Sequence, residues 1–167
     1  MYCGNSRRQP YQEDYDMIQE IMHVGVTVRD LDRSIAFYRD VLGLTFQGEI
    51  LMEGPETDAL FRRTGCRARV AYLNGSDHVM APPLELIQFV DKDSRQDPAD
   101  LFKTSISEIC FRVRDLDAVY ESLVAHGVDC LSAPQPFDFT ASGFGKSKAL
   151  YFRDPDGIIM ELMESVS

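Results

Sequence analysis

Apolar positions along the chain switch from a strand period to a helix period and back, and they do so twice. A β-branched run over 21–28 predicts a strand. Apolar side chains at helical spacing follow this run: Ile35, Phe37, Tyr38, Val41 and Leu42. Gly43 is expected to end the helix, and three further strands are predicted over 44–51, 67–73 and 84–90. The first half therefore predicts a β-α-β-β-β module.

The same order of elements returns after a charged stretch. The pattern predicts a strand over 106–113, a helix over about 116–125 and a short strand over 128–132. A partly extended loop over 134–148 then leads into 149–153, a turn over 154–157 and a last strand over 158–163. We therefore expect an N-terminal arm (1–20), a first module (21–91), a linker (92–104) and a second module (105–167). The two modules are expected to form one compact α+β domain.

The two predicted modules share residues as well as a pattern. Residues 22–32 (MHVGVTVRDLD) return at 107–117 (SEICFRVRDLD), and Leu-Glu-Leu at 84–86 returns as Met-Glu-Leu at 160–162. When the two repeats are aligned, the position of His23 corresponds to that of Glu108, and the position of Glu85 corresponds to that of Glu161. A set of metal-ligating residue types in repeated positions indicates a shared site where the modules meet.

Composition narrows the classes of partner. Against 17 Lys and Arg stand 27 Asp and Glu, a net charge of −10, which disfavours nucleic acid and anionic membrane surfaces. No apolar run reaches the roughly 18 residues of a membrane span, and the N-terminus lacks a signal-peptide core, so a cytoplasmic protein is expected.

The four cysteines form no C-x-x-C pair, and Cys110, in an apolar strand pattern, is expected to be a small core residue.

Several motifs connect this pattern to a known family. They are residues 23–28 (HVGVTV) with 30–32 (DLD), 37–44 (FYRDVLGL) and 151–157 (YFRDPDG) followed by Glu161. In these motifs the chain resembles the glyoxalase-like branch of the vicinal oxygen chelate superfamily, which includes glyoxalase I, methylmalonyl-CoA epimerase, extradiol dioxygenases and fosfomycin- and bleomycin-resistance proteins. The resemblance implies a cupped, incompletely closed mixed sheet with the helices outside. It leaves the chemistry open, because one scaffold serves several reactions.

The resemblance also implies one divalent metal ion in the cup. Its ligand positions fall on His23, Glu85, Glu108 and Glu161, and Glu108 is a departure because the glyoxalase-like branch usually has histidine there. Strand alternation places Glu85 and Glu161 in apolar rows, where a buried carboxylate needs either a metal ion or an arginine. With one imidazole and up to three carboxylates, Mn, Fe, Co, Ni and Zn are the candidate metals.

Three interpretations of Glu108 remain open. It could be a ligand, a general base held near the ion, or a residue of a pocket that binds no metal. Arg112 lies two strand positions further on, shares the face of Glu108 and could neutralise it.

A single candidate histidine disfavours an extradiol dioxygenase, which commonly uses two histidines and one carboxylate. The first hypothesis is a metal-dependent isomerase, lyase or epimerase in which the metal stabilises an enediolate and Glu161 or Glu108 moves the proton. The alternative is a metal-free binding protein whose cup is lined by aromatic side chains: Phe46, Tyr72, Phe89, Phe111, Phe137 and Phe139. Both hypotheses expect a small-molecule ligand and a homodimer.

Overall fold

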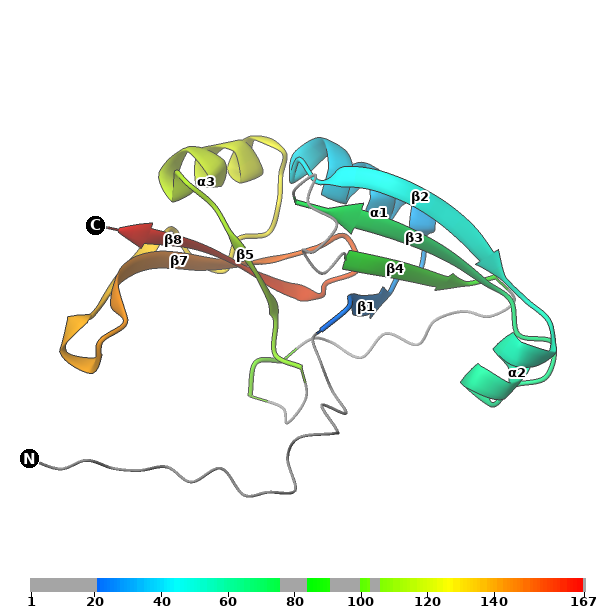
Figure 1. Cartoon of the computed structure of the whole chain (residues 1–167). Coiled ribbons are helices and arrows are strands. Elements are labelled where there is room, and N and C mark those ends of the chain that lie inside the picture. Colours follow the sequence, from blue (N-terminus) through cyan, green and yellow to red (C-terminus); the bar gives the residue numbers. More distant parts are fainter. Residues whose placement is uncertain (1–20, 76–83, 91–99, 103–105, 167) are drawn as a thin grey trace, which may run out of the picture.

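A computed structural model describes residues 21–75, 84–90, 100–102 and 106–166 of the chain. The predicted N-terminal arm and most of the predicted linker lie outside these residues. The described part contains two βαβββ modules, which confirms the predicted α+β class (Figure 1). No helix in these ranges is long and apolar enough to cross a lipid bilayer.

Each module contains a four-stranded mixed sheet. In the first, β1 (Val24–Thr27), β4 (Leu84–Phe89), β3 (Ala68–Asn74) and β2 (Thr45–Met52) lie in the order β1-β4-β3-β2. In the second, β5 (Ile109–Arg112), β8 (Ile159–Val166), β7 (Gly145–Arg153) and β6 (Gln135–Phe139) lie in the order β5-β8-β7-β6. The first strand pairs in parallel with the last in both modules, and the other pairs are antiparallel. The two sheets are thus copies in topology.

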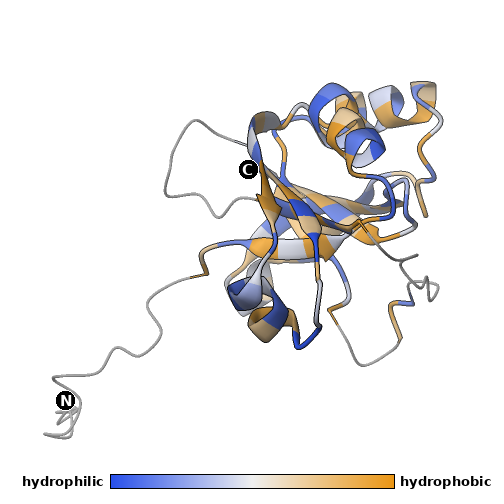
Figure 2. Cartoon of the chain, turned by 90° about the vertical axis from the view of Figure 1, so that its right-hand side faces the viewer, coloured by the Kyte–Doolittle hydropathy of each residue, from blue (hydrophilic) through white to orange (hydrophobic). Residues whose placement is uncertain are grey.

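The two predicted helices begin in the same way. Asp30 caps α1 (Leu31–Ala36) and Asp115 caps α3 (Leu116–Ala125), each by accepting a 3.0 Å hydrogen bond from the third backbone amide beyond it. α1 continues as a π-helical turn, η1 (Phe37–Val41), which ends before Gly43 at a φ of 74°. α1 buries Leu31 and Ile35, and α3 buries Leu116 and Leu123. Figure 2 shows hydrophobic and hydrophilic stretches alternating along the helices.

Three regions differ from the sequence prediction. A short helix, α2 (Pro55–Phe61), lies in a stretch with no predicted element, and the Asp58 carboxylate fixes the following turn by accepting from the amides of Gly65 and Cys66. The segment 134–148 contains β6, a 3-10 turn, η2 (Thr140–Ser142), and the start of β7. The predicted strand over 128–132 is only one bridge, between Cys130 and Phe152.

One hydrophobic core joins the modules. It contains buried residues from β1, α1, β3 and β4 together with residues from α3, β7 and β8. Phe152 of β7 is fully buried and its ring lies 6.5 Å from that of Phe37 in η1. The modules therefore fold against each other rather than as separate units.

A polar clasp closes the same interface. Tyr38 donates from its hydroxyl to Asp154 Oδ2 at 2.9 Å, and Asp154 Oδ1 accepts from two amides of the turn before β8. Asp156, 6% exposed, binds Arg29 Nε at 2.7 Å and Arg33 Nη2 at 2.6 Å. The turn of the second module is thus attached to the first helix of the first module.

Asp156→Asn is expected to lower the free energy of unfolding by about 1–3 kcal/mol at pH 7, because it leaves two arginines without their carboxylate. Burial raises the pKa of Asp156, but the hydrogen bonds from Arg29 and Arg33 more than offset this and the pKa lies below its usual value. The stabilisation is therefore present above the unfolded pKa of about 3.9 and is lost as pH falls through the folded pKa.

Urea unfolding at pH 7 and at successively lower pH measures this effect. The difference between wild type and Asp156→Asn should shrink below about pH 4. Asp129→Asn is the control, since that exposed carboxylate lies 3.5 Å from Arg153, and it should change stability by less than about 0.5 kcal/mol. Equal losses for the two variants would contradict the clasp.

Candidate functional site

In the first sheet, Glu85 lies on the face opposite the shared core. Its neighbours Leu84 and Leu86 point into that core, so strand alternation turns the Glu85 carboxylate to the other side. Glu85 is only 9% exposed, and its Oε2 lies 3.3 Å from Nε2 of His23, just before β1. The side chain of His23 is 46% exposed, so the imidazole borders open space.

Tyr72 holds the other oxygen of Glu85. These two residues face each other across β3 and β4, and the Tyr72 hydroxyl donates to Glu85 Oε1 at 2.8 Å. Burial, followed by this hydrogen bond and the charge of Glu85, raises the pKa of Tyr72. No ion pair joins Glu85 to an arginine within the described ranges. The carboxylate is therefore held by a phenol and an imidazole.

Gly25 gives this carboxylate its space. It pairs with Glu85 across β1 and β4, and a Cβ at this position would come within 3.2 Å of Glu85 Oε2. A side chain here would force the carboxylate or its neighbour to shift. Glycine thus allows Glu85 and His23 to approach each other.

In the second sheet, Glu161 takes the equivalent place. It is 9% exposed and lies between Cys110 of β5 and Tyr151 of β7 in the strand register. Burial, the hydrogen bond from the thiol to Glu161 and the charges of Glu161 and Glu108 raise the pKa of Cys110 to about 12. Burial and the same two carboxylates raise the pKa of Tyr151. Glu108 and Glu161 therefore act on one small region of this face.

The prediction that Cys110 belongs to the core is wrong, because Cys110 is exposed. Ile109 and Phe111, on either side of it, pack against the core instead. Because Ile109, Cys110 and Phe111 are all apolar, the sequence does not show which of them faces the core. In the structure, strand alternation turns Cys110 toward Glu161. Phe111 accordingly does not line the same face as Glu161, and no ion pair links Arg112 to Glu108 in the part of the chain that is described.

The two faces match position by position. Glu85 corresponds to Glu161, Tyr72 to Tyr151 and Gly25 to Cys110 in the strand registers, while the sequence repeat relates His23 to Glu108. Among the described residues, no three His, Cys, Asp or Glu side chains lie close enough together to hold one ion. The four predicted ligands thus form two pairs within one chain, and we call these pairs the two half-sites.

Sequence reasoning did not identify Tyr72 and Tyr151 as the neighbours of the two carboxylates. A signal was present, since Ala71-Tyr72-Leu73 and Leu150-Tyr151-Phe152 each place a tyrosine between apolar residues ahead of the strand that carries the glutamate. Antiparallel pairing brings such a tyrosine opposite that glutamate.

Comparison with known families agrees with the duplicated fold. Residues 20–162 match the model of the Glyoxalase/Bleomycin resistance protein/Dioxygenase superfamily, over most of the chain. The chain belongs to this superfamily. Among curated members, it is 30% identical over 148 residues to a lactoylglutathione lyase of Haemophilus influenzae, covering 89% of this chain and 94% of that protein. It is also 27% identical to the uncharacterized protein YaeR of Escherichia coli over 147 residues, 88% of this chain and 97% of YaeR.

Solved structures of the superfamily share the fold. A glyoxalase family protein from Bacillus cereus superposes with a TM-score of 0.78 at 20% identity, covering 90% of this chain and 96% of that one. The trypanothione-dependent glyoxalase I of Leishmania major gives a TM-score of 0.64 at 22% identity, with coverages of 88% and 87%. At these identities the likeness concerns the fold alone.

Proposed function

We propose that this superfamily member is a divalent-metal-dependent isomerase, lyase or epimerase of glyoxalase type that works as a homodimer. Each complete site would combine the His23–Glu85 half-site of one copy with the Glu108–Glu161 half-site of its partner. The observation that carries this proposal is the presence of two matching half-sites, each with two candidate ligands, which form no larger cluster among the described residues of one chain.

The donor set fits a divalent cation. Glu85 and Glu161 are nearly buried carboxylates whose neighbours are phenol, imidazole and thiol groups, none of which is a fixed cation. Burying a carboxylate in this way is costly unless a positive charge compensates it. One imidazole nitrogen and carboxylate oxygens suit borderline cations such as Mn, Fe, Co, Ni and Zn.

When bound, the cation would stabilise negative charge that develops on oxygen atoms of the substrate. His23 and Glu85 would hold it from one side, with Tyr72 and Gly25 fixing the position of Glu85. On the other side, Glu161 or Glu108 would take a proton from one substrate carbon and return it to the adjacent carbon. Cys110 and Tyr151 would orient Glu161 by the bond and the register already described.

The reaction class is tested by proton exchange. Metal-loaded protein is incubated in D₂O with a panel of thioesters that carry an acidic carbon-bound hydrogen next to the carbonyl, led by lactoylglutathione, the compound named in the Haemophilus relative. We expect deuterium to enter that position, as seen by NMR, and EDTA to stop the exchange. Absence of exchange in fully loaded protein with every thioester would contradict the proposal.

Tyr72→Phe is expected to weaken metal binding about 10- to 100-fold, because it removes the hydrogen bond that orients the Glu85 carboxylate. Titration of the apo protein with metal measures the affinity. Tyr120→Phe, on α3, is the matched control and should leave the affinity unchanged. Equal affinities for wild type and Tyr72→Phe would show that Tyr72 does not position a ligand.

A second candidate function is favoured by one observation. Phe137 and Phe139 are 42% and 48% exposed, and their rings stack at 5.7 Å and 9°. Their pairing with Ser147 and Gly145 places them on the same face as Tyr151. Such a surface suits a flat apolar molecule, as a metal-free binding protein would need. In that case the purified protein would bind aromatic ligands equally well in EDTA.

A further inference from the structure

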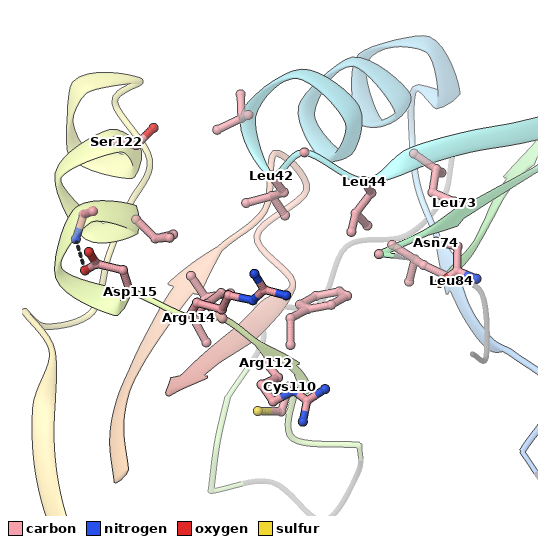
Figure 3. Close-up of a pocket in the computed structure, with 18 residues that line it drawn as sticks. Leu42, Leu44, Leu73, Asn74, Leu84, Cys110, Arg112, Arg114, Asp115 and Ser122 are labelled. Carbon is pink, nitrogen blue, oxygen red and sulfur yellow. Dashed lines mark hydrogen bonds between the residues drawn. The ribbon is translucent and has the colours of Figure 1, made fainter. Parts of the chain in front are cut away.

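A groove of about 790 Å³ lies between the modules. Its walls come from the end of η1, the facing ends of β3 and β4, and the segment from β5 into α3 (Figure 3). Most of the wall is apolar: Val41, Leu42, Leu44, Leu73, Leu84, Phe111, Val113, Val119 and Leu162. None of the four predicted metal ligands lines it, and Cys110 is the residue that it shares with the surroundings of Glu161. The groove is of a size that holds small organic molecules.

The duplicated fold offers a comparison for this groove. At the related place beside α1, the turn of the second module packs against the helix, with Tyr38, Phe152 and the Asp156 clasp filling the contact. Beside α3, the corresponding space between the helix and the ends of β3 and β4 is the groove. Among the described residues, which leave out 76–83 between β3 and β4, no turn fills this space in the same way.

Positive charge borders the groove. Arg112 and Arg114 both line the groove, and no ion pair joins either to a carboxylate in the described ranges. Figure 3 shows the guanidinium of Arg114 directed toward the side of the groove that carries Leu42 and Leu44. Asp115 is the acidic lining residue among those described, and its carboxylate caps α3 at Ala118 N. Arg112 and Arg114 thus bring positive charge to the groove in a chain with a net charge of −10, and Glu164 lines a neighbouring hollow together with them.

We propose that this groove is a second ligand site, which takes a small amphipathic carboxylate. The apolar part of the ligand lies among the leucines between η1 and β2 and that of β3, and its carboxylate pairs with Arg114, with Arg112 adding positive charge. A guanidinium and a carboxylate form strong paired hydrogen bonds. Burial of a hydrocarbon tail against the apolar wall further stabilises the complex. This site is independent of the proposed enzymatic function, since it needs neither the metal nor a half-site residue.

The test uses octanoate as the probe, in EDTA, with binding measured by calorimetry on the full chain. Wild type should bind octanoate, and 1-octanol should bind at least about tenfold more weakly because it lacks the charge. Arg114→Gln should weaken octanoate binding at least about tenfold, and Arg63→Gln, which changes an exposed arginine of the first module, should leave it unchanged. Ser122→Phe, which places a ring at the wall formed by α3, should abolish binding.

Three results would overturn the proposal. They are failure of wild type to bind octanoate, equal binding by wild type and Arg114→Gln, and undiminished binding by a folded Ser122→Phe variant. Circular dichroism of each variant shows whether it is folded. Because all measurements are made without metal, a negative result here leaves the deuterium-exchange test of the proposed function untouched.

Discussion

Glu161→Gln is expected to remove stoichiometric metal binding and to lower deuterium exchange at least about a hundredfold. The amide is a neutral and weaker ligand than the carboxylate, and it cannot accept a proton from the substrate. Glu161 is also the residue toward which Cys110 and Tyr151 are directed, so its loss removes the centre of its half-site. Elemental analysis of protein incubated with the candidate metals, with NMR exchange on the same samples, measures both effects.

Two companion variants sharpen this prediction. Glu121→Gln changes an exposed glutamate on α3 and should keep both metal and exchange. Glu108→Gln separates the roles left open for that residue, because a ligand variant loses metal whereas a base variant keeps metal and loses exchange. Full metal content and full exchange in Glu161→Gln would be incompatible with the proposed site.

Phe152→Ala is expected to lower the free energy of unfolding by about 3–5 kcal/mol, since it empties a fully buried ring position in the core that both modules share. The Phe152 ring contacts Phe37 across the module interface, so its loss should lower the stability of both modules together. We therefore expect a single unfolding transition at a lower urea concentration. Urea unfolding followed by circular dichroism measures the change. Phe144→Ala, at 84% exposed, is the control and should shift stability by less than about 0.5 kcal/mol. A small effect for Phe152→Ala would mean that the modules do not depend on each other.

The sequence repeat predicted the fold well, because hydrophobic periodicity indicates the type of each secondary-structure element and which of its faces is apolar. The two predicted helices and most strands lie close to their predicted ranges. Alternation placed Glu85 and Glu161 each on one face of its strand, and in the structure that face lies opposite the core. The helix α2 was missed because it is short and its apolar residues are few, although Gly54 before Pro55 is typical of a helix start. The exposed position of Cys110 was missed because its neighbours are as apolar as it is.

The sequence does not predict how the candidate ligands are arranged in space. Alternation states which face of its own sheet carries Glu85 or Glu161, but not which sheet that face meets in space. The clasp between Asp156 and Arg29 joins positions 127 residues apart, and no local pattern predicts such a contact. Whether His23 and Glu161 meet depends on packing of that kind, so the sequence could suggest four candidate ligands without predicting that one chain holds them as two pairs.

The central claim, that each site is shared between two copies, is tested most directly by complementation. One variant lacks the first half-site (His23→Ala with Glu85→Gln) and the other lacks the second (Glu108→Gln with Glu161→Gln). The two are unfolded together, refolded as an equal mixture and loaded with metal. Random pairing gives one intact site in each mixed dimer, so the mixture should regain about a quarter of the metal content and exchange activity of wild type, whereas each variant alone has none. A mixture as inactive as its components, although the copies have paired, would contradict the shared site.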